Sequence, residues 1–282
     1  MKIVQQEAVN FHLTNSIPRR LATRWMGWFS KIESPVICAI SLCVWQLFTD
    51  LDLSDARETR FGSMHACFTR RLKDGARRVE ADPAILVSPC DAIVGATGSI
   101  EDGTLFQIKG MPYKLEELLG DDAQAEPFRN GQYVTLRLTS AMYHRFHAPH
   151  ECRVTRVTHL FGDTWNVNPV TLQRVERLYC KNERAVILMT LAEPAREIIL
   201  VAVAAILVAG IRLDFVDLTE ESRKLPCQHY ACDSTLQKGA EMGWFEHGST
   251  IVMIVKSGFS LCCGIQDGAR VSVGQALMRL PA

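Results

Sequence analysis

The hydrophobic pattern of the chain changes near residue 80, and this change constrains the fold more than any other feature. Before it, apolar residues recur at helical spacing over 18–32 and 36–48, and a third helix is expected over 61–72. After it, short β-branched runs alternate with Gly, Pro and Asp, which indicates strands joined by turns. The strands are expected over residues 85–87, 93–95, 133–138, 153–160, 185–191, 198–203, 206–211 and 249–255. We therefore predict an α+β fold, with a helical region over 1–80 and a mainly antiparallel, barrel-sandwich-like β core over 81–282.

Length and composition exclude several classes of protein. The 282 residues are 48% hydrophobic, and 31 basic residues balance 31 acidic ones. Intrinsic disorder and binding to bulk nucleic acid are therefore poor interpretations. The longest apolar runs fall short of the roughly 18 to 20 residues that cross a bilayer. Ten cysteines without a recognisable signal peptide indicate a reducing compartment. Cys227, His229 and Cys232 lie close together but lack a second half-site, so no metal site is predicted.

The first predicted helix carries an apolar stripe that includes Trp25, Trp28 and Phe29, with Arg20 and Arg24 along its edge. Residues 1–31 contain five Lys or Arg against one Glu. This pattern suits a helix that lies in the headgroup layer of an anionic membrane. An amphipathic helix that packs on its own domain would show the same stripe, so both interpretations remain open on this feature alone.

A weak repeat near the C-terminus predicts two similar hairpin corners. Each copy has a Gly flanked by apolar residues at the same spacing, in the sets Leu236, Gly239, Met242, Phe245 and Val271, Gly274, Leu277, Leu280. A turn at Gly followed by inward-facing apolar residues is typical of barrel-sandwich folds such as lipoyl carriers.

The residues that could carry chemistry centre on three histidines within 143–150. His144 and His147 follow an apolar strand, where they could transfer protons, hold a metal or simply lie on a surface loop. Asp91 follows a proline turn before another strand. Its carboxylate could bond its own backbone, or it could fix the tautomer of a histidine base.

Three motifs occur in a fixed order: Pro-x-Asp ending at Asp91, Tyr-His-Arg-x-His-x-Pro at 143–149, and Lys-Gly-x-Glu-x-Gly-x-Phe at 238–245 followed by Gly-Ser-Thr at 248–250. With these motifs the chain resembles the phosphatidylserine decarboxylase family. Val167-Asn168-Pro169 and Asn182-Glu183-Arg184 occur at the expected intervals. The order of these motifs spans most of the chain. Three positions depart from the family pattern, namely His247 before the expected cut and Ala204 and Ala209 where glycine is common.

The resemblance implies that the chain makes its own cofactor. Ser249 would attack the Gly248 carbonyl, with His147 as base and Asp91 as its orienting partner, and a pyruvoyl group would form from Ser249. The cut would give a long β chain of residues 1–248 and a short α chain of residues 249–282. The pyruvoyl carbonyl would then form a Schiff base with phosphatidylserine, carbon dioxide would leave, and His144 would donate the proton that completes phosphatidylethanolamine.

The same resemblance implies where the protein acts and with what partners. Because phosphatidylserine stays in the bilayer, we expect peripheral binding to the cytoplasmic side of the cell membrane, with Arg20, Arg24, Trp25, Trp28 and Phe29 as the contact. The two cleaved chains are expected to form a heterodimer, with a dimer of that unit as a further expectation, and no nucleic acid is expected.

Two other functions fit parts of the sequence. The hairpin repeat suits a non-enzymatic carrier or adaptor, which would present a modified lysine at a hairpin tip, although Lys238 does not lie between apolar strands. A pyruvoyl decarboxylase for a soluble amino acid would share the self-cleaving serine, but the basic aromatic helix argues against it.

Overall fold

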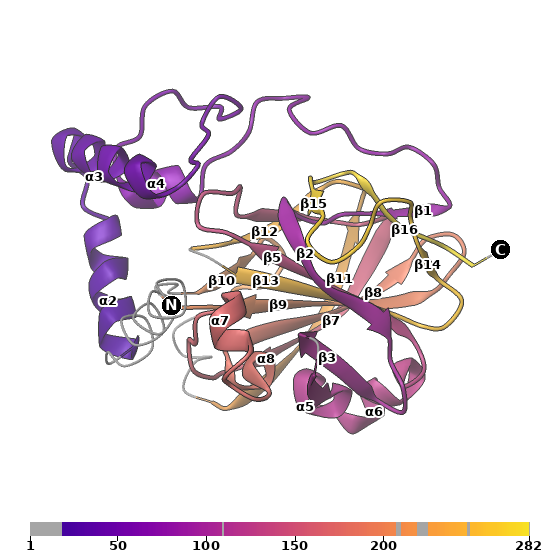
Figure 1. Ribbon diagram of the computed structural model, residues 1–282. Coiled ribbons are helices and arrows are strands. Elements are labelled where there is room, and N and C mark those ends of the chain that lie inside the picture. The colour runs from indigo at the N-terminus through magenta and orange to yellow at the C-terminus, as the bar shows by residue number, and fades with distance from the viewer. Residues whose placement is uncertain (1–18, 109, 207–209, 219–224, 247–248, 282) are drawn as a thin grey trace.

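The computed structural model describes residues 19–108, 110–206, 210–218, 225–246 and 249–281. Its first helices stand to one side of the strands, at the left of Figure 1: α2 (Arg19–Ser30), α3 (Pro35–Phe48) and the short α4 (Met64–Phe68). Ser34 and Ser63 cap α3 and α4, since their hydroxyls accept from Ile37 and Ala66 N–H respectively. The helices expected over 18–32 and 36–48 are confirmed. The helix expected over 61–72 is reduced to five residues, because its serine cap delays the start and the chain turns at Thr69.

The centre of the molecule is an eight-stranded sheet in which every ladder is antiparallel. In spatial order its strands are β11 (Cys227–Leu236), β7 (Cys152–Leu160), β8 (Arg184–Leu191), β9 (Glu197–Ala204), β13 (Ser249–Val255), β5 (Gln132–Leu138), β2 (Ala92–Ser99) and β15 (Arg270–Val271). Alternate residues of β13 point to the two faces, and all seven are buried. A strand covered on both faces reads as a continuous apolar run, which explains the pattern of 251–255.

Two different layers cover the faces of this sheet. One face packs against two small sheets, β1 (Ile85–Val87) with β16 (Ala276–Arg279) and β14 (Ser260–Leu261), and β10 (Ile211–Leu213) with β12 (Glu241–Phe245) and β6 (Arg145–His147). The other face packs against a hairpin and short helices: β3 (Thr104–Ile108), β4 (Met111–Lys114), α5 (Leu115–Leu119), α6 (Asp122–Ala125), η1 (Glu126–Phe128), α7 (Pro169–Leu172) and α8 (Leu178–Lys181).

The predicted α+β class and the mainly antiparallel pairing are confirmed, but the barrel is wrong. Within the described ranges none of the sheets closes on itself, and β11 and β15 remain as separate edges of the large sheet. Closure is unnecessary because both faces already have a covering layer.

Most predicted strands lie where the sequence placed them. The run over 206–211 is the exception, since residues 207–209 lie outside the described residues and the strand begins only at Ile211. β11 was missed because its residues alternate between exposed and half-buried and include few large apolar side chains.

The two glycines of the C-terminal repeat form equivalent corners around one residue. Gly239 and Gly274 both have φ of +83° and stand just before β12 and β16. A Cβ on Gly239 would lie 2.7 Å from Val79 Cγ2, and one on Gly274 would lie 2.9 Å from Val79 Cα. Both positions therefore need glycine for conformation and for space. The repeat is therefore a pair of turns that both contact the segment around Val79, which connects the helical region to β1.

Candidate active site

Ser249 begins β13 at one end of the central sheet. Its ladder partners are Leu138, the last residue of β5, and Ala204, the last residue of β9. The serine is fully buried, and its hydroxyl has no hydrogen-bond partner among the described residues. A buried hydroxyl in this state costs free energy, which marks it as a candidate for chemistry. Gly248, the other half of the expected cleavage site, and His247 before it lie outside the described residues.

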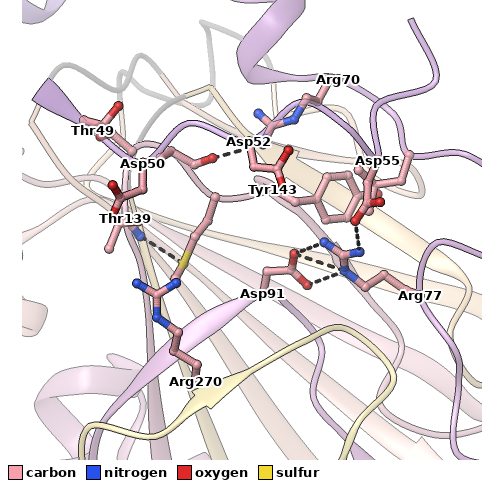
Figure 2. Close-up of a pocket in the computed structure, with 14 residues that line it drawn as sticks. Thr49, Asp50, Asp52, Asp55, Arg70, Arg77, Asp91, Thr139, Tyr143 and Arg270 are labelled. Atoms are coloured by element: carbon pink, nitrogen blue, oxygen red, sulfur yellow. Dashed lines mark hydrogen bonds and ion pairs between the residues drawn. The ribbon is translucent and has the colours of Figure 1, made fainter. Parts of the chain in front are cut away.

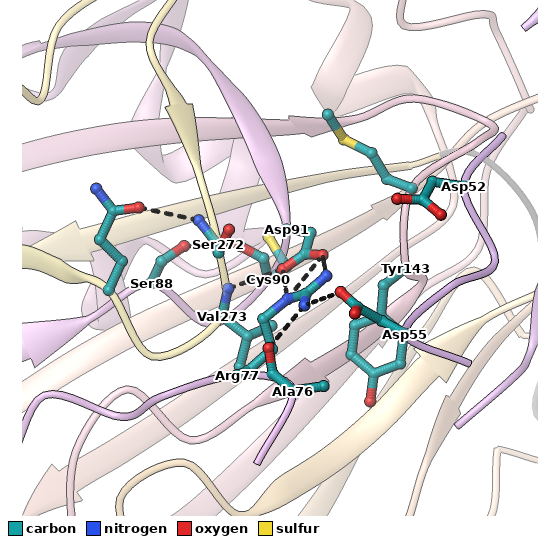
Figure 3. A network of polar contacts seen from close by, with 12 residues as sticks. Asp52, Asp55, Ala76, Arg77, Ser88, Cys90, Asp91, Tyr143, Ser272 and Val273 are labelled. Carbon is teal, nitrogen blue, oxygen red and sulfur yellow. Dashed lines mark hydrogen bonds and ion pairs between the residues drawn. The ribbon is translucent and has the colours of Figure 1, made fainter. Parts of the chain in front are cut away.

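Asp91 stands just before β2 and is held by an arginine that the sequence did not reveal. Arg77 Nε lies 3.0 and 3.1 Å from the two carboxylate oxygens and Arg77 Nη2 lies 2.6 Å from Oδ2 (Figure 2). Val273 N–H donates to Oδ1 at 2.9 Å, and Asp55 accepts a further bond from Arg77 at 2.8 Å (Figure 3). Hydrogen bonding to Asp91 raises the pKa of Arg77 above its ordinary value. The carboxylate thus joins Arg77 to the C-terminal segment.

His147, at the end of β6, is held through both ring nitrogens. Nδ1 lies 2.9 Å from the Gly239 carbonyl, which can only accept, so Nδ1 carries the proton. Nε2 therefore accepts from the Tyr143 hydroxyl at 3.0 Å. Burial lowers the pKa of His147, and the bond to Gly239 and the charges of Glu241 and Asp91 offset part of this effect. His147 is thus a neutral imidazole whose basic nitrogen, Nε2, accepts a hydrogen bond from Tyr143.

The structure places Asp91 and His147 near each other without a hydrogen bond between their side chains in the described part of the chain. His147 N–H donates to the carbonyl of Pro89, two residues before Asp91, at 2.8 Å. The expected orienting contact is made instead by Gly239 and Tyr143. Asp91 acts on the imidazole through its charge, which raises the pKa of His147.

His144 immediately precedes β6 and is fully buried. Its carbonyl accepts from Phe245 N–H at 3.0 Å, and Phe245 is the last residue of β12 before the expected cut. His147 pairs instead with Glu241 at the start of β12. Two residues lie between the two histidines, so three residue steps along an extended chain place their Cα atoms about 10 Å apart. The imidazole of His144 packs against the ring of Phe68, with centroids 5.1 Å apart.

Two of the cavities lined by described residues meet at Thr139 and Ser140, just after β5. The first, of about 360 Å³, is the Arg77 cavity of Figure 2 and is lined by residues that include Asp55, Arg70, Arg77, Asp91, Thr139, Ser140, Tyr143 and Arg270. The second, of about 310 Å³, we call the strand-end cavity; it is lined by Phe68, Arg137, Leu138, Thr139, Ser140, Asn166, Val167, Asn168, Ala205 and Ile206. The two share Thr139 and Ser140. The strand-end cavity includes one ladder partner of Ser249 and the neighbour of the other.

The predicted membrane contact lies on α2, and the structure adds a second apolar surface. Trp25 and Trp28 are exposed, the latter by 64%, while Phe29 is half-buried and stacks on Trp25. Arg20 and Arg24 belong to α2, but their side chains lie outside the described residues. The α3 surface, which the sequence did not single out, exposes Val36, Ile37, Ile40, Val44, Leu47 and Phe48. None of the described helices has the length and apolar character of a membrane span.

The structure reveals four residues around the site that the sequence analysis did not assign: Tyr143 and Gly239 beside His147, Arg77 beside Asp91, and Phe68 beside His144. Tyr143 and Gly239 belong to the quoted motifs, so they could have been suspected, whereas Arg77 and Phe68 carry no local signal. Lys238, the residue that a carrier would modify, donates its ammonium to the Asp82 carbonyl at 2.7 Å. The ammonium of Lys238 is therefore held by a backbone contact and is not presented at a hairpin tip, as a carrier would require.

Comparison with known proteins identifies the family of this chain. The family profile described as phosphatidylserine decarboxylase matches residues 64–279. The phosphatidylserine decarboxylase proenzyme of Acinetobacter baumannii is 33% identical over 243 residues, which cover 85% of this chain and 84% of that protein. The proenzyme of Xanthomonas campestris pv. campestris is 35% identical over 275 residues, covering 95% and 96% respectively. Since the matched range contains the buried serine, both histidines and Asp91, this chain belongs to the phosphatidylserine decarboxylase family.

Proposed function

We propose that this protein decarboxylates phosphatidylserine to phosphatidylethanolamine and that its cofactor is a pyruvoyl group made from Ser249. The observation that carries the proposal is the position of Ser249, fully buried at the start of the central strand with a hydroxyl that has no partner among the described residues. A group generated from the backbone there would be fixed by two flanking strands, through Leu138 and Ala204. The residues present therefore fit a cofactor that is part of the chain.

Loss of carbon dioxide from an α-amino acid leaves an electron pair on Cα, which no unmodified side chain can accept. When formed, a pyruvoyl carbonyl supplies the acceptor by condensing with the substrate amine. The protein residues must then bind the lipid, keep water from the site and return a proton.

The self-cleavage that we propose starts at the serine hydroxyl. Ser249 Oγ attacks the Gly248 carbonyl carbon, and the Gly248–Ser249 C–N bond breaks to leave an ester and a free amine. Elimination of the ester then releases Gly248 with a carboxylate, and hydrolysis of the remaining unsaturated residue releases ammonia and leaves the ketone. His147 takes the serine proton. Because its Nε2 is engaged by Tyr143, the proton reaches it through that hydroxyl or after the hydroxyl turns away.

The roles of the two histidines in this proposal are separated along β6. His144 immediately precedes β6, and its carbonyl accepts from the N–H of Phe245, which lies three residues before Gly248. Its ring contacts Phe68, which lines the strand-end cavity. We assign it the proton that returns to Cα after carbon dioxide has left. His147, ten ångströms or so along the strand, serves the cleavage.

The membrane contact is also part of the proposal. A lipid with two acyl chains remains in the bilayer, so the protein must dock there, and Trp25 and Trp28 with the α3 surface offer apolar area for burial. Trp45 of α3 stacks on Phe68 with ring centroids 4.5 Å apart, and Phe68 contacts His144. The docking helices and the proposed proton donor are therefore neighbours. We place the protein as a peripheral protein on the cytoplasmic side of the cell membrane.

The experiment that tests the proposal compares intact masses and activities of four purified proteins. The wild type should give fragments 1–248 and 249–282, the latter with a ketone in place of the serine amine, and should release carbon dioxide from phosphatidylserine vesicles but not from free serine. Ser249→Ala should stay uncut and inactive. Ser260→Ala, which changes an exposed serine of β14, should behave as the wild type.

His144→Ala is the fourth protein, and it separates the two reactions. It should cleave normally yet decarboxylate at least 100-fold more slowly, because only the proton donor is lost. An active wild type that remains in one piece would refute the pyruvoyl assignment. Failure of His144→Ala to cleave would refute the division of labour between the histidines.

A further inference from the structure

We propose that the strand-end cavity binds the phosphodiester of the lipid headgroup, with Arg137, Asn166 and Asn168 as its donors. The inference deepens the proposed function and rests on it for the identity of the lipid. The cavity itself is present in the uncut chain, so its affinity for an anion can be measured whether or not Ser249 is processed.

Arg137 is a half-buried cation that has no counter-ion among the described residues. It lies on β5 opposite Thr250 of β13, and no carboxylate or other hydrogen-bond acceptor pairs with its guanidinium among the described residues. Burial lowers the pKa of Arg137, as expected for a charge withdrawn from water without a full partner. Arginines that are partly buried normally pair with an anion, because the unpaired charge is costly. A bound anion would supply the partner that the described residues do not provide.

Arg137 lines the cavity, and Ser249 is the ladder partner of a second lining residue, Leu138. Arg137 precedes Leu138, so its side chain points away from the face shared by Leu138 and Ser249. Arg137 and Leu138 both line the cavity, which continues past the end of β5 to Thr139 and Ser140. Ser249 itself is not among the lining residues, and it is linked to the cavity through its ladder partner Leu138. A headgroup seated there can present its amine to position 249 and its phosphorus to Arg137.

Two asparagine side chains that line the cavity are held in place because the Oδ1 atom of each accepts a backbone N–H. Asn168 Oδ1 accepts from Thr171 N–H at 2.8 Å as the cap of α7, and Asn166 Oδ1 accepts from Asn168 N–H at 3.0 Å. The NH₂ group of each amide is left as a donor, with no partner among the described residues. Both asparagines line the cavity. The Val-Asn-Pro motif thus supplies an oriented donor next to Arg137.

The loop that carries these asparagines is tied to the end of β9. Asn182 bonds both backbone groups of Trp165 at 2.8 and 2.9 Å, and its Nδ2 also donates to the Ala204 carbonyl at 2.8 Å. Ala204 is the ladder partner of Ser249. The Asn-Glu-Arg motif therefore fixes the distance between the donors and the reacting position, as a preorganised site requires.

The lining chemistry selects an anion. The cavity contains one guanidinium, two amides and two hydroxyls, and no aspartate or glutamate is among its lining residues. Phosphatidylserine offers two anions, a carboxylate and a phosphodiester. A guanidinium on the carboxylate would stabilise the ground state more than the transition state, because that charge is lost as carbon dioxide departs. The phosphodiester keeps its charge throughout, so pairing it with Arg137 does not oppose the reaction.

The test measures binding of two headgroup fragments by isothermal titration calorimetry. Glycerophosphoethanolamine has the phosphodiester without a carboxylate, and O-methylserine has the carboxylate without phosphorus. Arg137→Gln and Asn168→Asp should each weaken glycerophosphoethanolamine binding at least tenfold and change O-methylserine binding less than twofold. Aspartate caps a helix as well as asparagine does, so Asn168→Asp keeps the fold of α7 while it places a repelling charge in the cavity.

Matched variants and two further outcomes make the test decisive. Arg137→Lys should recover part of the affinity, and Arg153→Gln, which removes an exposed arginine of β7, should change nothing. Loss of O-methylserine binding with retention of glycerophosphoethanolamine would assign Arg137 to the carboxylate and overturn the proposal. Unchanged affinity for both fragments would overturn the anion site itself. Absence of cleavage or decarboxylation in the wild type would instead count against the proposed function, because the titration needs neither reaction.

Discussion

At the scale of single residues, the environment of His147 predicts how self-cleavage depends on pH. Burial lowers the pKa of its imidazole below the ordinary value near 6.5, so the neutral, basic form persists into more acidic solution. The cleavage rate of freshly synthesised chain should therefore stay high as pH falls through about 6.5 and decline only below it. Cell-free synthesis followed by denaturing gels at a series of pH values measures this midpoint.

The variant Asp91→Asn tests whether His147 sets the pH dependence of cleavage. The charge of Asp91 raises the pKa of His147, so Asp91→Asn should move the midpoint to still lower pH, in addition to slowing cleavage through the lost ion pair with Arg77. A wild-type midpoint at or above 6.5 would show that a group other than His147 limits the acid side.

The sequence motifs identify the candidate catalytic residues but not the residues that contact them. Asp91, His144, His147 and Ser249 stand in motifs whose order is readable along the chain. Arg77 and Phe68 became visible only in three dimensions, because neither lies in a pattern and each meets its partner across a fold-dependent distance. For the same reason the orienting contact expected from Asp91 is made instead by the Gly239 carbonyl, ninety-two positions away, which accepts from His147 Nδ1–H.

At the scale of elements, α3 predicts where the membrane contact is strongest. Leu47 and Phe48 are exposed by 80% and 82% at its C-terminal end, and the helix carries no charged residue. The double variant Leu47→Gln, Phe48→Ser should lose about 3 kcal/mol of apolar burial in the membrane. Its partition to phosphatidylserine vesicles should therefore fall about a hundredfold. Co-sedimentation measures the partition. Phe106→Ser, on the distant β3 in Figure 1, is the matched control and should bind as the wild type.

Retained binding of the double variant with normal self-cleavage would restrict the contact to α2. The sequence pointed to α2 because its apolar stripe has a clear helical period. It passed over α3 because a helix that is apolar all round has no period that says which side faces outward. Only the position of α4 and of the ring of Trp45 shows which face of α3 is covered.

At the scale of the whole molecule, the proposed cut does not release a piece of protein. Residues 249–281 provide the central strand β13 and the strands β14, β15 and β16, which pair with β9, β5, β2 and β1. The two chains of the mature protein should therefore elute together on size exclusion at the position of uncut Ser249→Ala, and should separate only in denaturant. Elution of a free short chain from native protein would contradict this arrangement.

The global architecture was partly readable from the sequence. The split into a helical beginning and an antiparallel remainder followed from periodicity, and the paired glycines were recognised as corners. The open sheet with two unlike covering layers was not, because closure and layering depend on contacts between segments far apart in the chain.

The central position of β13 makes maturation a one-way event for the fold. An uncut chain assembles the sheet in a single-molecule reaction, with its middle strand tethered to β12. Once the tether is gone, a denatured molecule must find its short companion by diffusion, so recovery becomes dependent on concentration and competes with aggregation. Each catalyst is thus built once, and its working lifetime is set by how slowly the paired chains come apart.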